Sequence, residues 1–296
     1  MRRSLSEIIE ERLAEMGAAG LLATCLPIIT VGGAASVVVG DVALKAAALI
    51  VTLVFIAFTL AFLLHRNLTV RRENALYRFF VHKYCEVLFE QFPEPWRLTE
   101  WHHSVLLDHI GNVQQTIIVH GVARSKNLSF YKTTLHAAWP QSSRIKSRVA
   151  VQVRSLELEE IGGTRTKAIP LWLEDGDLRI VVPFPETIPR GAEFKIVCTL
   201  EWPMKSRPLV RGDEPEEFCF LLRKPLEKFN YTVMLPRAFK VSCDRVGFTP
   251  GDPGLSLTVD RKHPTHTTVT VQGDNLIKTG RVGMRLDVEP PHRKEK

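Results

Sequence analysis

The stretch from Gly17 to Leu64 reads GAAGLLATCLPIITVGGAASVVVGDVALKAAALIVTLVFIAFTLAFLL and contains two apolar runs without a charged residue. The runs cover residues 17–39 and 46–64, and the six residues GDVALK separate them. About 20 apolar residues in a helix cross a hydrocarbon core of about 30 Å, and backbone polar groups in lipid need partners inside their own helix. The stretch therefore predicts a transmembrane helical hairpin over residues 17–64.

Basic residues beside the two runs predict the orientation of this hairpin. Three precede the first run, five lie between residues 66 and 83, and one lies in the connection. Cytoplasmic flanks carry the excess of Lys and Arg. We therefore expect a multi-pass protein of the inner (plasma) membrane with both termini and the C-terminal part in the cytoplasm. Arg66, Arg71 and Arg72 are predicted to contact lipid headgroups.

The cysteines and three sequence triplets bear on the same question. The chain has five cysteines, none in CxxC spacing, which favours reduced thiols in the cytosol. The triplets that begin at Asn67, Asn127 and Asn230 match the glycosylation acceptor pattern, which has meaning only on the outside of a cell. The charge asymmetry outweighs these triplets in our interpretation.

Small residues are frequent in the first run. Such residues let helix backbones approach closely in lipid. Two interpretations stay open: the small residues seat the hairpin against itself, or they support a homo-oligomer in the membrane. The candidate oligomerisation residues are Gly20, Gly32, Gly33 and Ser36.

Two further helical segments flank the hairpin. Residues 1–16 predict an amphipathic helix that begins with a capping box at Ser4 and Glu7. Residues 65–92 predict a juxtamembrane stalk helix that continues from the second run, with an apolar and aromatic stripe from Leu76 to Leu88. We expect this stripe to be buried, either on the soluble domain or on a second copy of the chain.

Residues 93–289 change to the period-two alternation of β-strands, and 290–296 form a basic tail. Short alternating segments between Gly- and Pro-containing turns predict an antiparallel all-β domain, a sandwich or a barrel-like fold. The loop 203–215 is the best place for a division into two halves. The fold class is thus a membrane-anchored α+β protein. The predicted strands are 115–120, 148–154, 177–182, 193–200, 217–222, 231–235, 255–259, 267–271 and 282–288.

No catalytic motif is recognisable in the chain. It lacks G-x-S-x-G and both phosphate-binding glycine loops, and no ionisable residue lies inside either run. His102, His103 and His109, like His263 and His266, lack a complete set of zinc ligands. We expect no catalytic residue, no metal and no cofactor, and hence no enzyme. The net charge of +7 partly reflects the membrane flanks and the tail, so we expect no nucleic-acid partner.

Five tryptophans offer flat surfaces on which a ligand could stack. Trp139 or Trp172, with an arginine at 144, 148 or 165, could hold a nucleotide by stacking and charge. Packing in the core of a β domain is the more common role of a buried tryptophan.

The layout resembles that of bacterial antiphage effectors built from two transmembrane helices and a β-strand-rich cytosolic domain. The residues that carry this resemblance are the runs 17–39 and 46–64 and the strand series from Gln115 to Val288. The resemblance implies that the β domain binds a cyclic nucleotide second messenger and that oligomerisation then disrupts the inner membrane. The chain departs from this pattern in its larger size and its long stalk, so no ligand-binding residue is carried over.

Three functions follow as hypotheses. The first is a non-enzymatic sensor or effector at the membrane, whose β domain recognises a small ligand or a protein and drives oligomerisation in antiviral defence. The second is a membrane-anchored scaffold whose β domain docks a partner protein. The third is a membrane-bound enzyme with an unrecognised site, which a polar cleft with perturbed carboxylates or histidines would support.

Overall fold

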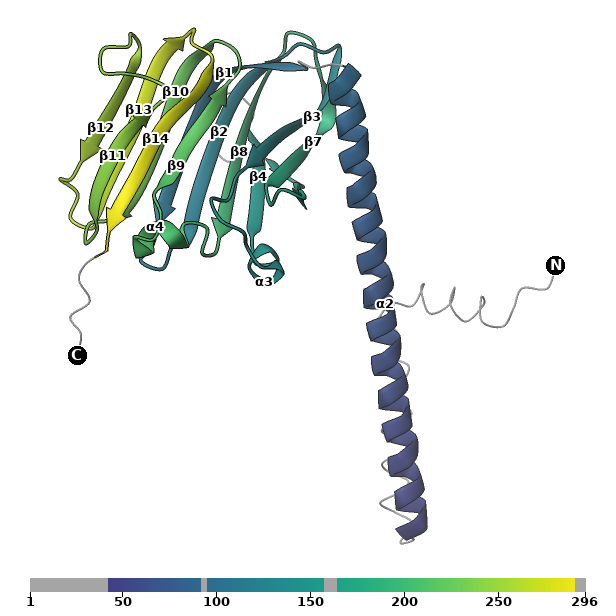
Figure 1. The fold of residues 1–296 in the computed structure, drawn as a ribbon. Helices are drawn as coiled ribbons and strands as arrows, with labels where there is room; N and C mark the ends of the chain where they lie inside the picture. Colours follow the sequence, from purple (N-terminus) through teal and green to yellow (C-terminus); the bar gives the residue numbers. More distant parts are fainter. Residues whose placement is uncertain (1–41, 92–94, 157–163, 291–296) are drawn as a thin grey trace, which may run out of the picture. The chain divides into compact units, whose positions relative to one another are not determined.

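The computed structural model describes residues 42–91, 95–156 and 164–290. The chain divides into two compact units, Met1–Tyr77 and Arg78–Lys296. The boundary falls inside one continuous helix, α2 (Val42–Gln91), so the helix contributes residues to both units (Figure 1).

The described part of the first unit is a single apolar helix segment. Leu49–Val70 is long and apolar enough to cross a membrane: its 22 residues span about 33 Å at 1.5 Å each. The Thr59 hydroxyl donates to the carbonyl oxygen of Phe55 at 2.9 Å, so this polar group is satisfied within the helix. The candidate span reaches six residues beyond the predicted end at Leu64 and therefore includes Arg66, near its end.

Only one candidate span lies in the part of the chain that the structure describes. The first predicted run, residues 17–39, lies outside that part, as do Gly20, Gly32, Gly33 and Ser36. The multi-pass arrangement and the oligomerisation residues therefore remain predictions.

The last turns of α2 belong to the second unit and pack on it through small side chains. Cys85, with Val81 beside it, contacts Phe130 and Val181. Phe79, Phe80 and Tyr84 are instead exposed by more than half. Of the two alternatives given for the aromatic stripe, burial on the soluble domain is not observed for these three side chains, and burial on a second copy remains a prediction. A small residue such as Cys85 allows the closer approach between helix and sheet.

Fourteen strands and two short helices form the rest of the second unit within the described residues. The short helices are α3 (Ser143–Lys146) and α4 (Arg207–Arg211). The strands are β1 (Trp96–Leu107), β2 (Val113–Ala123), β3 (Asn127–Leu135), β4 (Ala150–Leu156), β5 (Thr164–Thr166), β6 (Ile169–Trp172), β7 (Leu178–Pro189), β8 (Glu193–Trp202), β9 (Glu216–Leu222), β10 (Leu226–Pro236), β11 (Lys240–Val246), β12 (Leu255–Asp260), β13 (His266–Leu276) and β14 (Gly280–Glu289).

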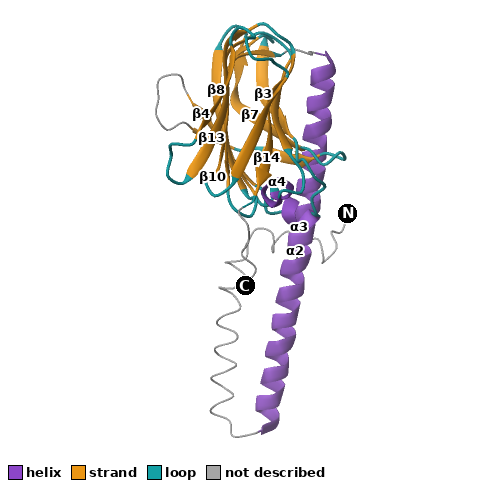
Figure 2. Ribbon diagram, turned by 60° about the vertical axis from the view of Figure 1, so that its left-hand side comes forward, coloured by secondary structure: helices purple, strands orange, loops and turns teal. Residues whose placement is uncertain are grey.

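These strands form three sheets. The largest has the order β12-β13-β10-β1-β2-β8-β4-β5, and two three-stranded sheets have the orders β11-β14-β9 and β3-β7-β6. Figure 2 shows β4, β8, β10 and β13 in one layer and β3, β7 and β14 in the other. Side chains from all three sheets meet in one core, and the described strands do not close into a barrel.

The prediction of a purely antiparallel domain needs one correction. β1 and β10 pair in parallel, with Trp101 opposite Phe229 and His103 opposite Tyr231. A tight hairpin imposes antiparallel pairing only on strands that are neighbours in sequence. β1 and β10 are far apart in the chain, so no hairpin constrains their direction. All other strand pairs are antiparallel.

The loop 203–215 is held to the core. It contains α4, whose Leu209 and Val210 are buried, and Gly212 ends this helix in the left-handed conformation at φ 72°. Glycine adopts this conformation without the steric cost that a Cβ imposes.

Candidate functional site

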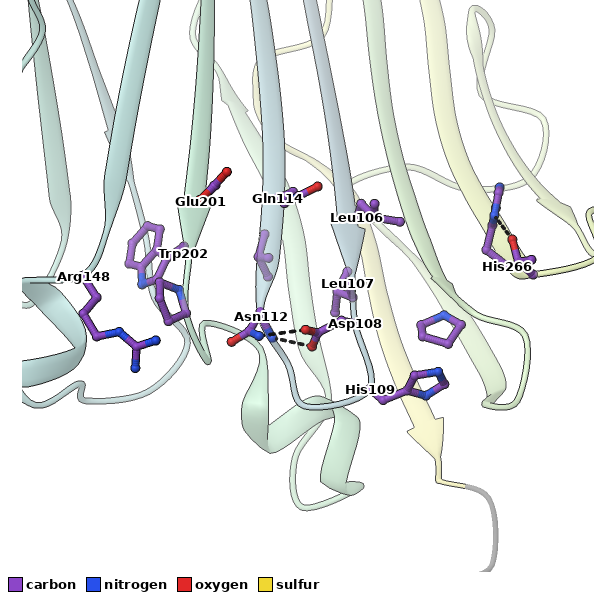
Figure 3. Close-up of a pocket in the computed structure, with 14 residues that line it drawn as sticks. Leu106, Leu107, Asp108, His109, Asn112, Gln114, Arg148, Glu201, Trp202 and His266 are labelled. Carbon is purple, nitrogen blue, oxygen red and sulfur yellow. Dashed lines mark hydrogen bonds between the residues drawn. The ribbon is translucent and has the colours of Figure 1, made fainter.

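One hollow in the second unit has a volume of about 520 Å³ and lies at the turn between β1 and β2 (Figure 3). The carboxylate of Asp108, which lines this hollow, accepts hydrogen bonds from the backbone N–H groups of Ile110 and Asn112 at 2.9 and 2.8 Å. It also accepts one from Asn112 Nδ2 at 2.7 Å. Asp108 thus stabilises its own turn. Arg148 and His109 lie well apart in the hollow, so its polar groups do not converge on one point.

Another hollow is a cleft of about 700 Å³ between two edge strands. β3 is the edge of one small sheet and β9 the edge of the other, and both line the cleft. Its floor comes from β1, β2 and β10, three neighbouring strands of the large sheet. The cleft therefore lies where the second layer is interrupted.

Aromatic side chains form much of the cleft lining. The Trp101 ring lies 4.3 Å from that of Phe220 and is stacked on Phe229 at 5.4 Å. Trp96, at the other side, lies 5.2 Å from Tyr131. Trp96 and Phe220 are partly exposed, so their surfaces are accessible to a flat ligand.

Four polar residues are buried among these rings, and we call them the buried polar cluster: His103, Gln115, Lys205 and Glu216. His103 Nε2 lies 3.1 Å from Gln115 Oε1, and Lys205 Nζ donates to Glu216 Oε1 at 3.1 Å. Each of the four is at most 7% exposed. Buried polar groups are tolerated when they are hydrogen-bonded, and these two pairs satisfy one another in part.

The pairing inside the cluster is incomplete. Gln115 Nε2 and Glu216 Oε2 have no hydrogen-bond partner among the described residues. A buried donor or acceptor without a partner is costly to the fold, so such atoms often mark a site where a ligand or water completes the bonding.

Positive charge surrounds the cleft. Six cations line it against two acidic residues. Lys205 and Glu216 neutralise each other, and Glu217 pairs with Arg281 at 2.6 Å. Arg97 pairs with Glu227, which is not a lining residue, at 3.4 Å, and the other lining cations are Arg124, Lys132, Arg223 and Lys224. The cleft thus offers a field that favours an anion.

The end of α2 lies beside one wall of this cleft within the second unit. Arg179 of β7 donates to Glu86 of α2 at 3.2 Å. Lys132, on the adjacent strand β3, has its pKa lowered by burial and by the neighbouring Arg179. Lys132 in the cleft lining therefore lies close to the ion pair that Arg179 makes with Glu86 of α2.

Burial changes the titration of His103. It lowers the pKa from an ordinary 6.5 to about 3, since the charged ring would lose its hydration. Between pH 3 and pH 6.5, His103 therefore binds a proton in the unfolded chain but not in the folded chain. Stability therefore falls with decreasing pH, by about 1.4 kcal/mol per unit from this group.

We predict that His103→Leu flattens the loss of thermal stability between pH 6.5 and 4.5. The measurement is the melting temperature across this range, compared with the wild type and with His102→Leu. His102 is the neighbouring, partly exposed histidine on β1, so it controls for the loss of an imidazole as such. An unchanged slope in His103→Leu would show that His103 titrates normally in the fold.

The residues proposed from the sequence for nucleotide stacking lie elsewhere. Trp139 Nε1 donates to the carbonyl oxygens of Met204 and Lys205 at 3.1 and 2.9 Å, which holds a loop in place. Trp172 packs edge-on against Trp202 at 5.3 Å. Arg165 donates to Gln152. Neither tryptophan, nor Arg144, Arg148 or Arg165, lines the cleft.

The histidines considered as metal ligands are also dispersed. His102 lies 3.5 Å from Glu100, and His263 stacks on His266 with ring centres 3.6 Å apart. Within the described ranges, no three His, Cys, Asp or Glu side chains come together in a way that could hold a metal ion.

No protein-family model and no curated protein matches the chain. Among solved structures, it is similar to a candidate protease from Parabacteroides distasonis, with 10% identity, a TM-score of 0.43, and coverage of 66% of this chain and 40% of that one. It is also similar to an M1 zinc metallopeptidase from Deinococcus radiodurans (10%, 0.39, 66% and 42%). A third is a candidate nutrient-binding protein from Legionella pneumophila (9%, 0.40, 65% and 67%).

These similarities correct one prediction from the sequence. The expectation that the chain is not an enzyme is contradicted, because a zinc metallopeptidase and a candidate protease are among the structures that resemble it. The absence of a familiar motif was its only basis, and we withdraw it. The chain spans only about two fifths of the length of these two proteins. A resemblance of this size assigns no role to any residue of this chain.

Proposed function

We propose that the chain is a membrane-anchored receptor whose β domain binds an anionic small molecule with a flat, apolar body. The cleft carries this proposal: it combines aromatic walls with a lining that holds six lysines and arginines and two carboxylates. Helix α2 connects the same unit to the candidate membrane span. Cleft volumes of 300–1,000 Å³ are typical of small-molecule sites, and this cleft of about 700 Å³ falls among them.

The nucleotide second messenger that the effector resemblance implies belongs to this chemical class. A base would stack on the partly exposed rings of Trp96 and Phe220, while phosphate would face the lining cations. Localisation of the β domain in the cytoplasm is part of the same proposal.

The test is a binding titration of the full chain in detergent micelles, with tryptophan fluorescence as the readout. Trp96 and Trp101 line the cleft, so a bound ring changes their emission. The probes are nucleoside monophosphates, a cyclic dinucleotide and phenyl phosphate, with uncharged nucleosides as controls. We expect the anions to bind at least 10-fold more tightly than the uncharged probes. If no anion binds, or if charge makes no difference, the proposal fails.

We further propose that ligand binding drives assembly of copies in the membrane and disrupts it. The exposed side chains of Phe79, Phe80 and Tyr84 on α2 support this proposal. Two copies anchored in the same membrane could bury these side chains against each other. We expect Phe80→Asp, like Gly32→Leu in the predicted first span, to abolish depolarisation of bacteria that express the chain. Lys262→Asp, at an exposed position of the β domain away from α2, is the control. Continued depolarisation by both variants would contradict assembly.

The runner-up is a scaffold that docks a partner protein. The edge strands β3 and β9 favour it, because an extended peptide can add to an edge strand. In that case hydrogen exchange along β9 slows when the partner binds, and the phosphate probes leave it unchanged.

A further inference from the structure

The cleft is bordered by two strands that each have one neighbour among the described strands. β3 pairs only with β7, and β9 pairs only with β14. The cleft lining includes β3 residues from Tyr131 to Leu135 and β9 residues from Glu216 to Leu222. Backbone N–H and C=O groups along such an edge can form a ladder with an added strand. At about 3.3 Å per residue, the 7 residues of β9 offer an edge of about 23 Å, which suits an extended segment of similar length.

The two edge strands run in opposite directions. β3 begins shortly after β2 ends, and β9 ends shortly before β10 begins. Because β10 is parallel to β1 and β1 is antiparallel to β2, β10 begins at the end of the large sheet where β2 ends. The start of β3 and the end of β9 therefore lie at the same end of the domain. A strand between them is antiparallel to one edge and parallel to the other, and both kinds of pairing form hydrogen-bonded ladders.

The end of the cleft where β3 begins and β9 ends carries positive charge. The turn between β2 and β3 supplies Arg124, and the turn between β9 and β10 supplies Arg223 and Lys224. All three side chains line the cleft. An occupant with acidic residues at this end is therefore favoured over a neutral or a basic one.

The buried polar cluster lies toward the opposite end of the cleft, since Glu216 is the first residue of β9 and Gln115 lies near the start of β2. Gln115 Nε2, a donor, and Glu216 Oε2, an acceptor, have no hydrogen-bond partner among the described residues. A primary amide offers a carbonyl oxygen that accepts and an N–H that donates. The side chain of an asparagine or glutamine thus matches both open atoms, whereas an aliphatic side chain leaves them unpaired at a cost.

We propose that the cleft accepts an extended segment of a partner protein as an inserted strand between β3 and β9. Acidic residues at one end of the segment face Arg124, Arg223 and Lys224, and an asparagine or glutamine at its other end completes the buried polar cluster. This inference rests on the scaffold function given as the runner-up and names the partner's segment. It goes beyond addition to one edge, because both edges and the floor of the cleft take part in binding.

The test uses seven-residue peptides with blocked termini and the full chain in detergent micelles. Two probes alternate valine and threonine between a pair of aspartates and one asparagine, and they differ in which of these stands at the N-terminus. Each probe has three controls, which replace the aspartates by lysines, the asparagine by leucine, or alternate residues by proline, which cannot donate to a ladder. We expect one probe to bind at least 10-fold more tightly than each of its controls. This comparison in the wild type does not depend on the folding of a variant.

Hydrogen exchange distinguishes insertion from addition to one edge. An inserted strand is expected to slow the exchange of backbone amides in both β3 and β9, because it pairs with both. Slower exchange along β9 alone would overturn insertion and leave the runner-up in its simpler form.

A variant assigns the preference for an amide to a named atom. Gln115→Met removes the open donor at similar size, and we expect it to reduce the preference for the asparagine probe over its leucine control at least 10-fold. Gln114→Met is the matched control, since Gln114 is the exposed neighbour on the same strand, and it should leave the preference unchanged. A full preference in Gln115→Met would show that the amide does not reach the buried polar cluster.

The outcomes separate the proposals for this cleft. If the phosphate probes bind and no peptide does, insertion is overturned, while the binding of a small anion stands. If a peptide binds with these preferences and no phosphate probe does, insertion stands and the small-anion function falls. If the proline controls bind as tightly as the probes, no ladder forms, and insertion is overturned whatever the phosphate probes do.

Discussion

Replacing Lys205 by methionine is expected to lower the free energy of unfolding by about 3–5 kcal/mol, the cost of leaving one partner of a buried ion pair alone. Lys205 is 7% exposed and Glu216 4%, and Lys205 Nζ donates a hydrogen bond to the Glu216 carboxylate at 3.1 Å. Methionine keeps much of the side-chain volume against Trp202 and Phe218, so the loss reflects charge more than packing.

The measurement is thermal unfolding of the full chain in detergent, where such a loss lowers the midpoint by roughly 10 °C. Lys240→Met is the control, because the Lys240–Glu289 pair is more than 70% exposed on both sides. A surface pair of this kind contributes about 0–1 kcal/mol. The double variant Lys205→Met with Glu216→Leu should recover much of the loss. A midpoint in Lys205→Met equal to that of Lys240→Met would show that the pair is hydrated in solution.

Hydrophobic patterning predicted the regular elements of this chain well. The second apolar run lies in α2, and each predicted strand overlaps an observed one, because burial on one face of a sheet enforces alternation. Five observed strands were not predicted: β1, β3, β5, β6 and β11. In β1 the alternation is interrupted. A register shift between Leu98 and Glu100 moves its inward positions from one phase to the other, which hides the alternation.

The cleft could not be predicted from local sequence patterns. Gln115 and Glu216 are about a hundred residues apart, and their shared cleft depends on the break between two small sheets and on the parallel pairing of β1 with β10. No short motif encodes either feature. The sequence does contain another indication of the cleft. Single polar residues, His103 and Gln115, occupy inward positions of strands that are otherwise apolar there.

Reversing two charges at the cleft rim is expected to weaken the binding of a nucleotide about 100-fold. Arg223 and Lys224 follow β9 directly and both line the cleft. Arg223→Glu combined with Lys224→Glu replaces attraction of phosphate by repulsion. The loss of about 1.4 kcal/mol for each tenfold step is well within the range of charge-assisted contacts.

The measurement is the dissociation constant for AMP and for phenyl phosphate, at low and at high salt. Both should weaken by the same factor, because the rim acts on the phosphate that they share, and the difference between wild type and variant should shrink at high salt. Lys167→Glu combined with Lys262→Glu changes the net charge equally at exposed positions outside the cleft. If this control weakens binding as much, attraction comes from the charge of the whole chain, and the rim has no specific part in holding the anion.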